Sequence, residues 1–225
     1  MVPAEPITLT AQPGRTGRGI RIAIIDSGVH ATHPHVGGIV GGTGFDDNGL
    51  EHDDFVDRLG HGTAVTAAIH EKAPGAALLV VKVFDRSLTA TGHALAAAIR
   101  WSIAQRVHII NLSLGTTNAA HRPLLEDVVS AAAQAGITVV AAAPDEQHAW
   151  LPGGITGVVA VELDWACPRD VCHVRHDEHG QMRVRASGYP RSIPGVPPER
   201  NLRGVSFAVA NATGLLAQAR EGQEP

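Results

Sequence analysis

Short, unbroken apolar runs alternate with alanine-rich stretches along this chain, and this alternation is the feature that most restricts its fold. The apolar runs predict strands at Gly19–Ile25, Ala77–Val83, Val107–Leu112, Ile137–Ala143 and Gly157–Val161. The longer stretches predict helices over His61–His70, Thr91–Gln105, Pro123–Ala135 and Ser206–Ala219. Strands without polar alternation are typical of a parallel sheet that is buried on both faces. The sequence therefore predicts an α/β fold, a three-layer α/β/α arrangement around a mostly parallel sheet.

The chain has 225 residues, which suits one domain, and we expect a single compact domain over residues 1–225. Val171–Arg175 and Met182–Ala186 flank a polar segment, a pattern typical of an antiparallel hairpin. Met1–Arg18 and Glu221–Pro225 have the composition of loose termini.

Charge and hydropathy argue against two classes of partner. The formal net charge of -4 provides no basic stripe for nucleic acid. No apolar run approaches the ~18–20 residues that a membrane span requires.

The thirteen histidines are scattered without metal-ligand spacing, so we expect neither a metal nor a cofactor. The first 19 residues lack the signature of a secretory signal, which predicts a cytoplasmic protein unless the sequence is a shortened form.

The two cysteines, Cys167 and Cys172, leave three alternatives open. They can be free thiols, they can close a small disulfide loop, or they can take part in a metal site. A disulfide suits an oxidising compartment, which conflicts with the missing signal. No second cysteine pair completes a common zinc motif.

Three distant segments each carry one residue type that nucleophilic hydrolysis requires. Asp26 ends an apolar strand, His61 stands between two glycines at the start of a helix, and Ser206 opens another helix behind Gly204. A serine becomes nucleophilic when a base takes its proton, and a neutral imidazole does this near neutral pH. An Asp orients such a histidine and stabilises its charged form. Alone, each residue has a structural interpretation as well: a strand-end turn, a packed histidine and a helix N-cap.

Taken together, these segments resemble the subtilisin-like serine proteases, or subtilases. They read Ile-Ala-Ile-Ile-Asp-Ser-Gly-Val, Gly-His-Gly-Thr and Gly-Val-Ser-Phe-Ala, and the resemblance extends from about Gly19 to Ala217. It implies that Asp26, His61 and Ser206 are a catalytic triad. It also implies that a peptide substrate adds as an extra strand to Ser113, Leu114 and Gly115. Ala141, Ala142 and Ala143 then form the opposite wall of the primary specificity pocket, and Gly115 lets a substrate side chain pass close to the backbone.

The resemblance fails at Pro144-Asp145, where subtilases have Gly-Asn. The family's Asn donates a hydrogen bond to the oxyanion of the reaction, whereas an ionised carboxylate has no proton to donate. Losing one such donor lowers turnover roughly 100- to 1,000-fold. Three outcomes follow: Asp145 is protonated and donates, Asp145 lies outside the oxyanion hole and the Ser206 N–H is the main donor, or the protein is a weak or silent protease.

Six acidic residues precede His61, at Asp46, Asp47, Glu51, Asp53, Asp54 and Asp57. This acidic run is interpreted first as a solvated loop, second as a surface that favours basic substrate residues, and last as a cation site. Glu146, next to the expected pocket, adds to the second alternative. A preference for a basic residue on the acyl side of the cut follows from it.

The leading hypothesis is a serine endopeptidase that cleaves a specific peptide or precursor protein through an acyl-enzyme. A specialised maturation role, such as leader-peptide removal, is the expected task. The alternative is a pseudo-protease that binds a peptide partner by strand addition without turnover. Whether a partner protein completes the site is left open.

Overall fold

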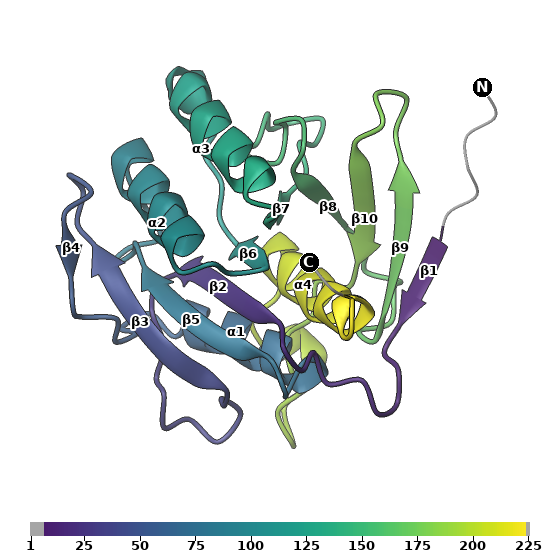
Figure 1. The fold of residues 1–225 in the computed structure, drawn as a ribbon. Helices are drawn as coiled ribbons and strands as arrows, with labels where there is room; N and C mark the ends of the chain where they lie inside the picture. Colours follow the sequence, from purple (N-terminus) through teal and green to yellow (C-terminus); the bar gives the residue numbers. More distant parts are fainter. Residues whose placement is uncertain (1–6, 224–225) are drawn as a thin grey trace.

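Ten strands form one sheet in the computed structural model, which describes residues 7–223 (Figure 1). The strand order is β1-β9-β10-β8-β7-β6-β2-β5-β3-β4. The strands are β1 (Ile7–Thr10), β2 (Arg21–Asp26), β3 (Ile39–Phe45), β4 (Glu51–His52), β5 (Ala77–Lys82), β6 (Ile109–Leu112), β7 (Thr138–Ala142), β8 (Val159–Leu163), β9 (Val171–His176) and β10 (Met182–Ala186). The helices are α1 (His61–Lys72), α2 (Gly92–Ala104), α3 (Arg122–Gln134) and α4 (Val205–Arg220), with short 3-10 turns at Ala119–His121 and Pro198–Arg200.

The centre of the sheet is parallel, as the apolar runs predict. Strands β3, β5, β2, β6, β7, β8 and β10 pair in parallel, while β1, β9 and β4 join antiparallel. The five strands and four helices expected from the sequence are all present, with ends within about two residues, and the hairpin is β9–β10.

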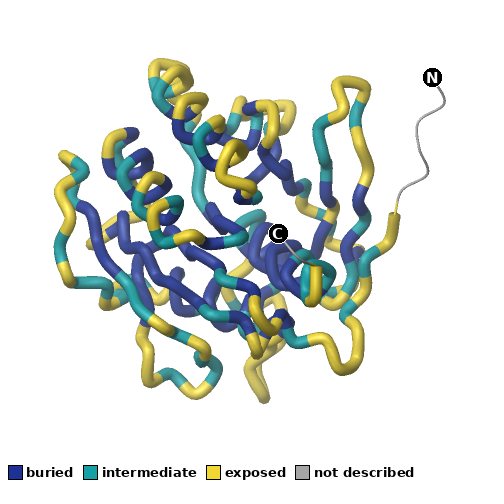
Figure 2. The backbone as a smooth tube through the Cα atoms, in the orientation of Figure 1, coloured by how far each residue is buried: buried dark blue, intermediate teal, exposed yellow. Residues whose placement is uncertain are grey.

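Helices cover both faces of the sheet, so the predicted three-layer α/β/α fold is confirmed. Ile22 and Ile24 of β2 pack with α1 and α4 on one face. Ala23 and Ile25 alternate to the other face and pack with α2 and α3. Figure 2 shows the central strands buried between these layers. Because β2 is fully buried on both faces, it carries Asp26 at its end into an interior that excludes water.

The N-terminal segment is more ordered than expected over its described part. Residues 1–6 and 224–225 lie outside the described residues, but β1 pairs with the edge strand β9. The Arg15 guanidinium donates to the carbonyl oxygens of Gln218 and Glu221 at the end of α4. The Glu221 carboxylate accepts the backbone N–H groups of Thr16 and Gly17. Over residues 7–18 and 221 the expectation of loose termini is therefore wrong, because each terminus supplies the polar partners of the other.

Both cysteines are free and buried. Burial raises the pKa of the Cys167 thiol, with added repulsion from Asp164 and Asp170. Burial also raises the pKa of Cys172 to about 12. Free thiols are thus the alternative that the structure favours. Among the described helices, none is both long and apolar enough to span a bilayer.

Candidate active site

Asp26 and His61 meet at the carboxyl end of β2. His61 Nδ1 lies 2.7 Å from Asp26 Oδ1, and the same oxygen accepts the Ser27 N–H at 2.7 Å. Asp26 is fully buried, and its Oδ2 has no hydrogen-bond partner among residues 7–223. A buried carboxylate with so few donors interacts strongly with the nearest ring. This arrangement fixes the tautomer of His61 with the proton on Nδ1 and leaves Nε2 free to accept another.

Asp57 joins the loop after β2 to the start of α1, and the sequence analysis missed this role. Its Oδ1 accepts the Ser27 hydroxyl at 2.8 Å and the N–H groups of Leu59 and Gly60 at 2.9 Å. Its Oδ2 accepts the N–H and the hydroxyl of Thr63 at 2.8 and 2.6 Å. The Asp57 carboxylate therefore holds both sides of His61 in place. Its position in an acidic run concealed this role in the sequence.

Gly62 permits the close approach of α1 to the Asp26 loop. A Cβ on Gly62 would lie 2.3 Å from the Gly28 carbonyl oxygen, which no side chain tolerates. The Gly62 N–H donates to the Ser27 hydroxyl at 2.9 Å. The Gly-His-Gly pattern thus has a steric reason at its second glycine.

Opposing influences set the protonation of His61. Burial by itself would lower the pKa of His61, but the hydrogen bond and charge of Asp26, with the charge of Asp57, raise it above its ordinary value. The ring is therefore a stronger base than a free histidine.

Ser206 is the second residue of α4, and it is anchored to the strand end at Ser113. The Ser206 hydroxyl donates to the Ser113 carbonyl at 2.9 Å, while the Ser113 hydroxyl donates to the Ser206 carbonyl at 2.9 Å. Asn111 extends this connection, donating to the Ser113 hydroxyl and accepting from the buried Thr213 hydroxyl of α4. In this conformation the Ser206 hydroxyl is thus bonded to Ser113 rather than to His61.

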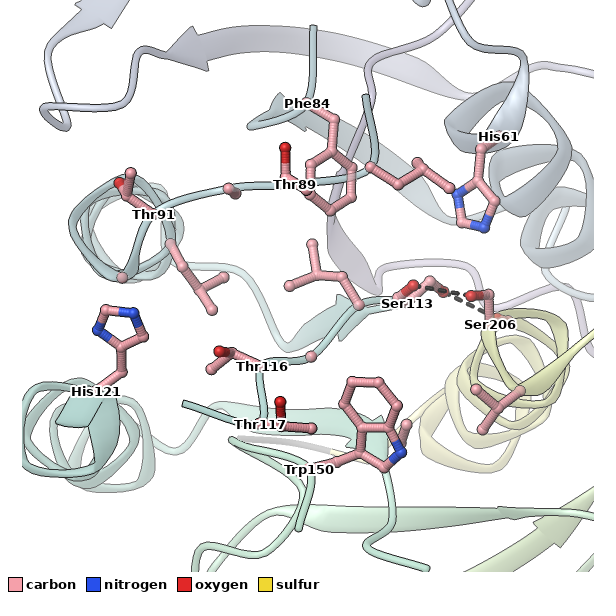
Figure 3. Close-up of a pocket in the computed structure, with 18 residues that line it drawn as sticks. His61, Phe84, Thr89, Thr91, Ser113, Thr116, Thr117, His121, Trp150 and Ser206 are labelled. Atoms are coloured by element: carbon pink, nitrogen blue, oxygen red, sulfur yellow. Dashed lines mark hydrogen bonds between the residues drawn. The ribbon is translucent and has the colours of Figure 1, made fainter. Parts of the chain in front are cut away.

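His61 and Ser206 line one cavity of about 400 Å³ (Figure 3). In Figure 3 the imidazole points toward Ser206 across the mouth of the cavity, and His121 lies at the far end. One wall is the segment 88–92, which leads into α2, and the other is the segment 113–117 after β6, with Trp150 beside it. Phe84, Leu95 and Leu114 provide an apolar lining. The segment 88–92, His121 and Trp150 were not expected, because they lie outside any motif.

The residues predicted to bind substrate divide into two groups. Ser113, Leu114, Gly115 and Ala142 line the cavity. Ala141 instead packs on the α2–α3 face of the sheet, and Ala143, Asp145 and Glu146 are absent from the lining. Alternation along β7 explains why Ala142 lines the cavity and Ala141 does not, since neighbouring side chains of a strand point to opposite faces.

Asp145 is placed unlike an oxyanion donor. Its Oδ1 accepts the N–H groups of Gln147 and His148 at 2.8 and 2.7 Å, and its Oδ2 is 3.4 Å from Trp150 Nε1. The N–H of Gln147 leads the contacts that lower the pKa of this exposed carboxyl group, so it is ionised at neutral pH. Of the three outcomes considered, this geometry favours Asp145 lying outside the oxyanion hole. The Ser206 N–H lies in the first turn of α4, where backbone donors have no intrahelical partner.

Most of the acidic residues before His61 form hydrogen bonds or ion pairs with other groups of the protein. Asp46 caps its own turn through the N–H groups of Asn48 and Leu50. Asp54 pairs with Arg58 and with the buried Lys82. Together with the interior contacts of Asp57, these pairings favour the structural interpretation over a basic-substrate surface. No group of three or more potential metal ligands is found within residues 7–223.

Comparison with known proteins identifies the family. The family model described as the subtilase family matches residues 17–163. This chain belongs to the subtilase family. This subtilase is 37% identical to a thermostable alkaline protease of Halalkalibacterium halodurans, over 91% of the chain and 57% of that protein. It is 29% identical to subtilisin E of Bacillus subtilis, over 90% of the chain and 53% of subtilisin E.

A third relative is the major intracellular serine protease of Bacillus subtilis. It is 34% identical over 59% of the chain and 45% of its own length. The chain thus spans about half the length of these three relatives. The resemblance inferred from the sequence motifs is confirmed at the level of the family.

Proposed function

We propose that this subtilase is a serine endopeptidase with Ser206 as nucleophile, His61 as general base and Asp26 as the residue that orients His61 and stabilises its protonated form. The observation that carries the proposal is the 2.7 Å contact between Asp26 and His61, with His61 and Ser206 on one cavity. We further propose that the chain acts as one domain, since a single sheet includes all ten described strands.

The reaction begins when the Ser206 hydroxyl leaves the Ser113 carbonyl and turns toward His61 Nε2. As Ser206 Oγ bonds to the substrate carbonyl carbon, its proton passes to Nε2, and Asp26 stabilises the resulting imidazolium. The negative charge on the former carbonyl oxygen is stabilised by the free Ser206 N–H at the positive end of α4. Nε2 then returns the proton to the leaving amine, which leaves an acyl-Ser206 ester that water hydrolyses by the same route.

This mechanism requires a neutral His61 and therefore predicts a pH dependence. Since the pKa of His61 is raised above its ordinary value, activity should decline on the acid side with an apparent pKa above that of a free histidine.

A pseudo-protease is the rival function, and two observations favour it. The Ser206 hydroxyl is bonded to Ser113 rather than to His61, and the ionised Asp145 cannot replace the amide donor of the family. Such a protein would bind a peptide along residues 113–115 without cleaving it.

Labelling with a fluorophosphonate distinguishes the two functions. The wild type and a Ser130→Ala control, altered on the exposed surface of α3, should gain one adduct by intact mass, whereas Ser206→Ala and His61→Ala should not. A folded wild-type protein that gains no adduct contradicts the protease proposal. Labelling without cleavage of any member of a peptide library supports the pseudo-protease.

The natural task proposed is cleavage of a specific peptide or precursor protein, such as maturation of a leader-bearing product. The intracellular relative supports a cytoplasmic location for that task. Cell fractionation with an antibody against the chain tests the location. Mass-spectrometric comparison of peptides in cells with the wild-type chain and with Ser206→Ala tests the substrate.

A further inference from the structure

Trp150 occupies space that the family resemblance gives to the substrate. The resemblance implies that a substrate side chain passes over Gly115, which leaves room for it because glycine has no side chain. A Cβ built on Gly115 would instead lie 3.1 Å from Cε3 of the Trp150 ring. The indole therefore lies directly against Gly115, and Figure 3 shows it on the same cavity as Ser206.

The Trp150 backbone is held on its carboxyl side. The next residue, Leu151, exchanges two backbone hydrogen bonds of 2.9 Å with Thr116, and the Trp150 carbonyl accepts the Gly154 N–H at 2.9 Å. Leu151 is itself buried in the α2–α3 core. The backbone that carries the ring is thus tied to the segment after β6 that lines the cavity.

The ring orientation is set by the segment that departs from the family pattern. The indole stacks on the His148 ring, with centroids 5.0 Å apart and planes inclined by 26°. Trp150 Nε1 points to Asp145 Oδ2, and Asp145 Oδ1 holds the His148 N–H. Asp145, His148 and Trp150 form one connected unit, which gives Asp145 a structural role and agrees with its lying outside the oxyanion hole, one of the three outcomes considered from the sequence.

We propose that Trp150 restricts the residue that supplies the cleaved carbonyl to a small side chain, such as Ala, Gly or Ser. This inference rests on the proposed endopeptidase function and names its substrate class. The restriction is steric, because the indole lies against Gly115, where the resemblance places a substrate side chain, whereas Phe84, Leu95 and His121 line other parts of the same cavity. Trp150 is a specificity-determining residue, and the catalytic chemistry remains with His61 and Ser206.

Two peptidyl diphenyl phosphonates that differ only in the residue next to phosphorus, alanine or phenylalanine, test the inference. The second-order rate of labelling is measured for each on the wild type, Trp150→Ala and Trp150→Leu. The matched control is Trp165→Ala, which removes an exposed tryptophan that makes an edge contact with the Tyr189 ring outside this cavity. Circular dichroism establishes that each variant is folded, and Trp150→Leu provides an intermediate size if Trp150→Ala does not fold.

The wild type and Trp165→Ala should react faster with the alanine probe. Trp150→Ala should raise the rate with the phenylalanine probe about 10- to 100-fold, the range that burial of one large apolar side chain supplies, and Trp150→Leu should raise it less. An unchanged ratio of the two rates in the folded Trp150 variants overturns the inference. A fluorophosphonate without a side chain is run in parallel: if it fails on every variant, the protease proposal fails, and if it labels all of them while the ratio is unchanged, only the Trp150 inference fails.

Discussion

Replacing Asp57 by Asn should destabilise the protein and alter the pH dependence of its activity. The Asn side chain can keep its oxygen at the Oδ1 position, where it accepts from Ser27, Leu59 and Gly60. At the Oδ2 position an amide NH₂ group would face Thr63. The Thr63 N–H then loses its acceptor, while the Thr63 hydroxyl can accept a bond from the new NH₂ group.

The size of the loss in unfolding free energy can be estimated from these contacts. One lost bond to a charged acceptor, with the weakening of the others when the charge is removed, costs about 2 to 4 kcal/mol. For a chain of this size that lowers the midpoint of thermal unfolding by about 4 to 16 °C. Burial alone would raise the pKa of Asp57, but the hydrogen bonds led by Thr63 lower it below its ordinary value. Asp57 therefore stabilises the fold above its unfolded pKa, and this contribution is lost as the pH falls through the folded pKa, a dependence that the Asn variant lacks.

The same substitution acts on His61. The Asp57 charge helps to raise the pKa of His61, so its removal should lower that pKa and move the acid limb of the kcat/KM profile to lower pH. Because Asp57 does not line the active-site cavity, KM should change less than kcat. The assays are thermal unfolding and kcat/KM between pH 5 and 9, with the exposed Asp53→Asn as the matched control. A folded Asp57→Asn protein with the unfolding midpoint and acid limb of the wild type would refute the reasoning.

Three further predictions concern residues away from the reacting atoms. Asp145→Asn should leave the rate within roughly twofold of the wild type, about 0.5 kcal/mol, and the pH profile unchanged, because the amide oxygen still accepts the N–H groups of Gln147 and His148 and only the 3.4 Å contact with Trp150 Nε1 is lost; a large gain in turnover would instead place this residue in the oxyanion hole. Burial, followed by the charge of Arg169, lowers the pKa of Lys72 to about 8 in the folded protein. Between pH 8 and the ordinary lysine pKa, the unfolded chain therefore binds more protons than the folded one, and the free energy of unfolding should rise with pH across this window. Lys72→Met should lose this rise, which amounts to about 3 kcal/mol and is measured by urea unfolding at several pH values. A difference in unfolding free energy between Lys72→Met and the wild type that does not change with pH would contradict this prediction. Both buried thiols, Cys167 and Cys172, should resist a disulfide-exchange reagent in the native protein and react in guanidinium; if neither reacts after non-reducing denaturation, they are joined as a disulfide.

Local patterns in the sequence determined the architecture and the candidate triad. Continuous apolar runs predicted the central strands, because a strand covered on both faces has no polar position to reveal alternation. The parallel order of these strands then placed Asp26 at a carboxyl end, where active sites of such sheets lie. Strand β3 escaped prediction because Gly41, Gly42 and Gly44 give it little strand propensity, and it forms by pairing with β5.

Only the tertiary structure revealed the contacts of Asp57, Asp145 and Trp150 on which their proposed roles rest. Each role depends on contacts with segments distant in the chain or with turn geometry that no periodic pattern encodes. Asp57 is indistinguishable from its acidic neighbours until Ser27 and Thr63 meet it, and Trp150 acquires a role only when the Leu151 backbone pairs with Thr116. Burial periodicity is a property of each segment and can be read along the chain, whereas the partner of a polar side chain is set by where the sheet and helices bring other segments.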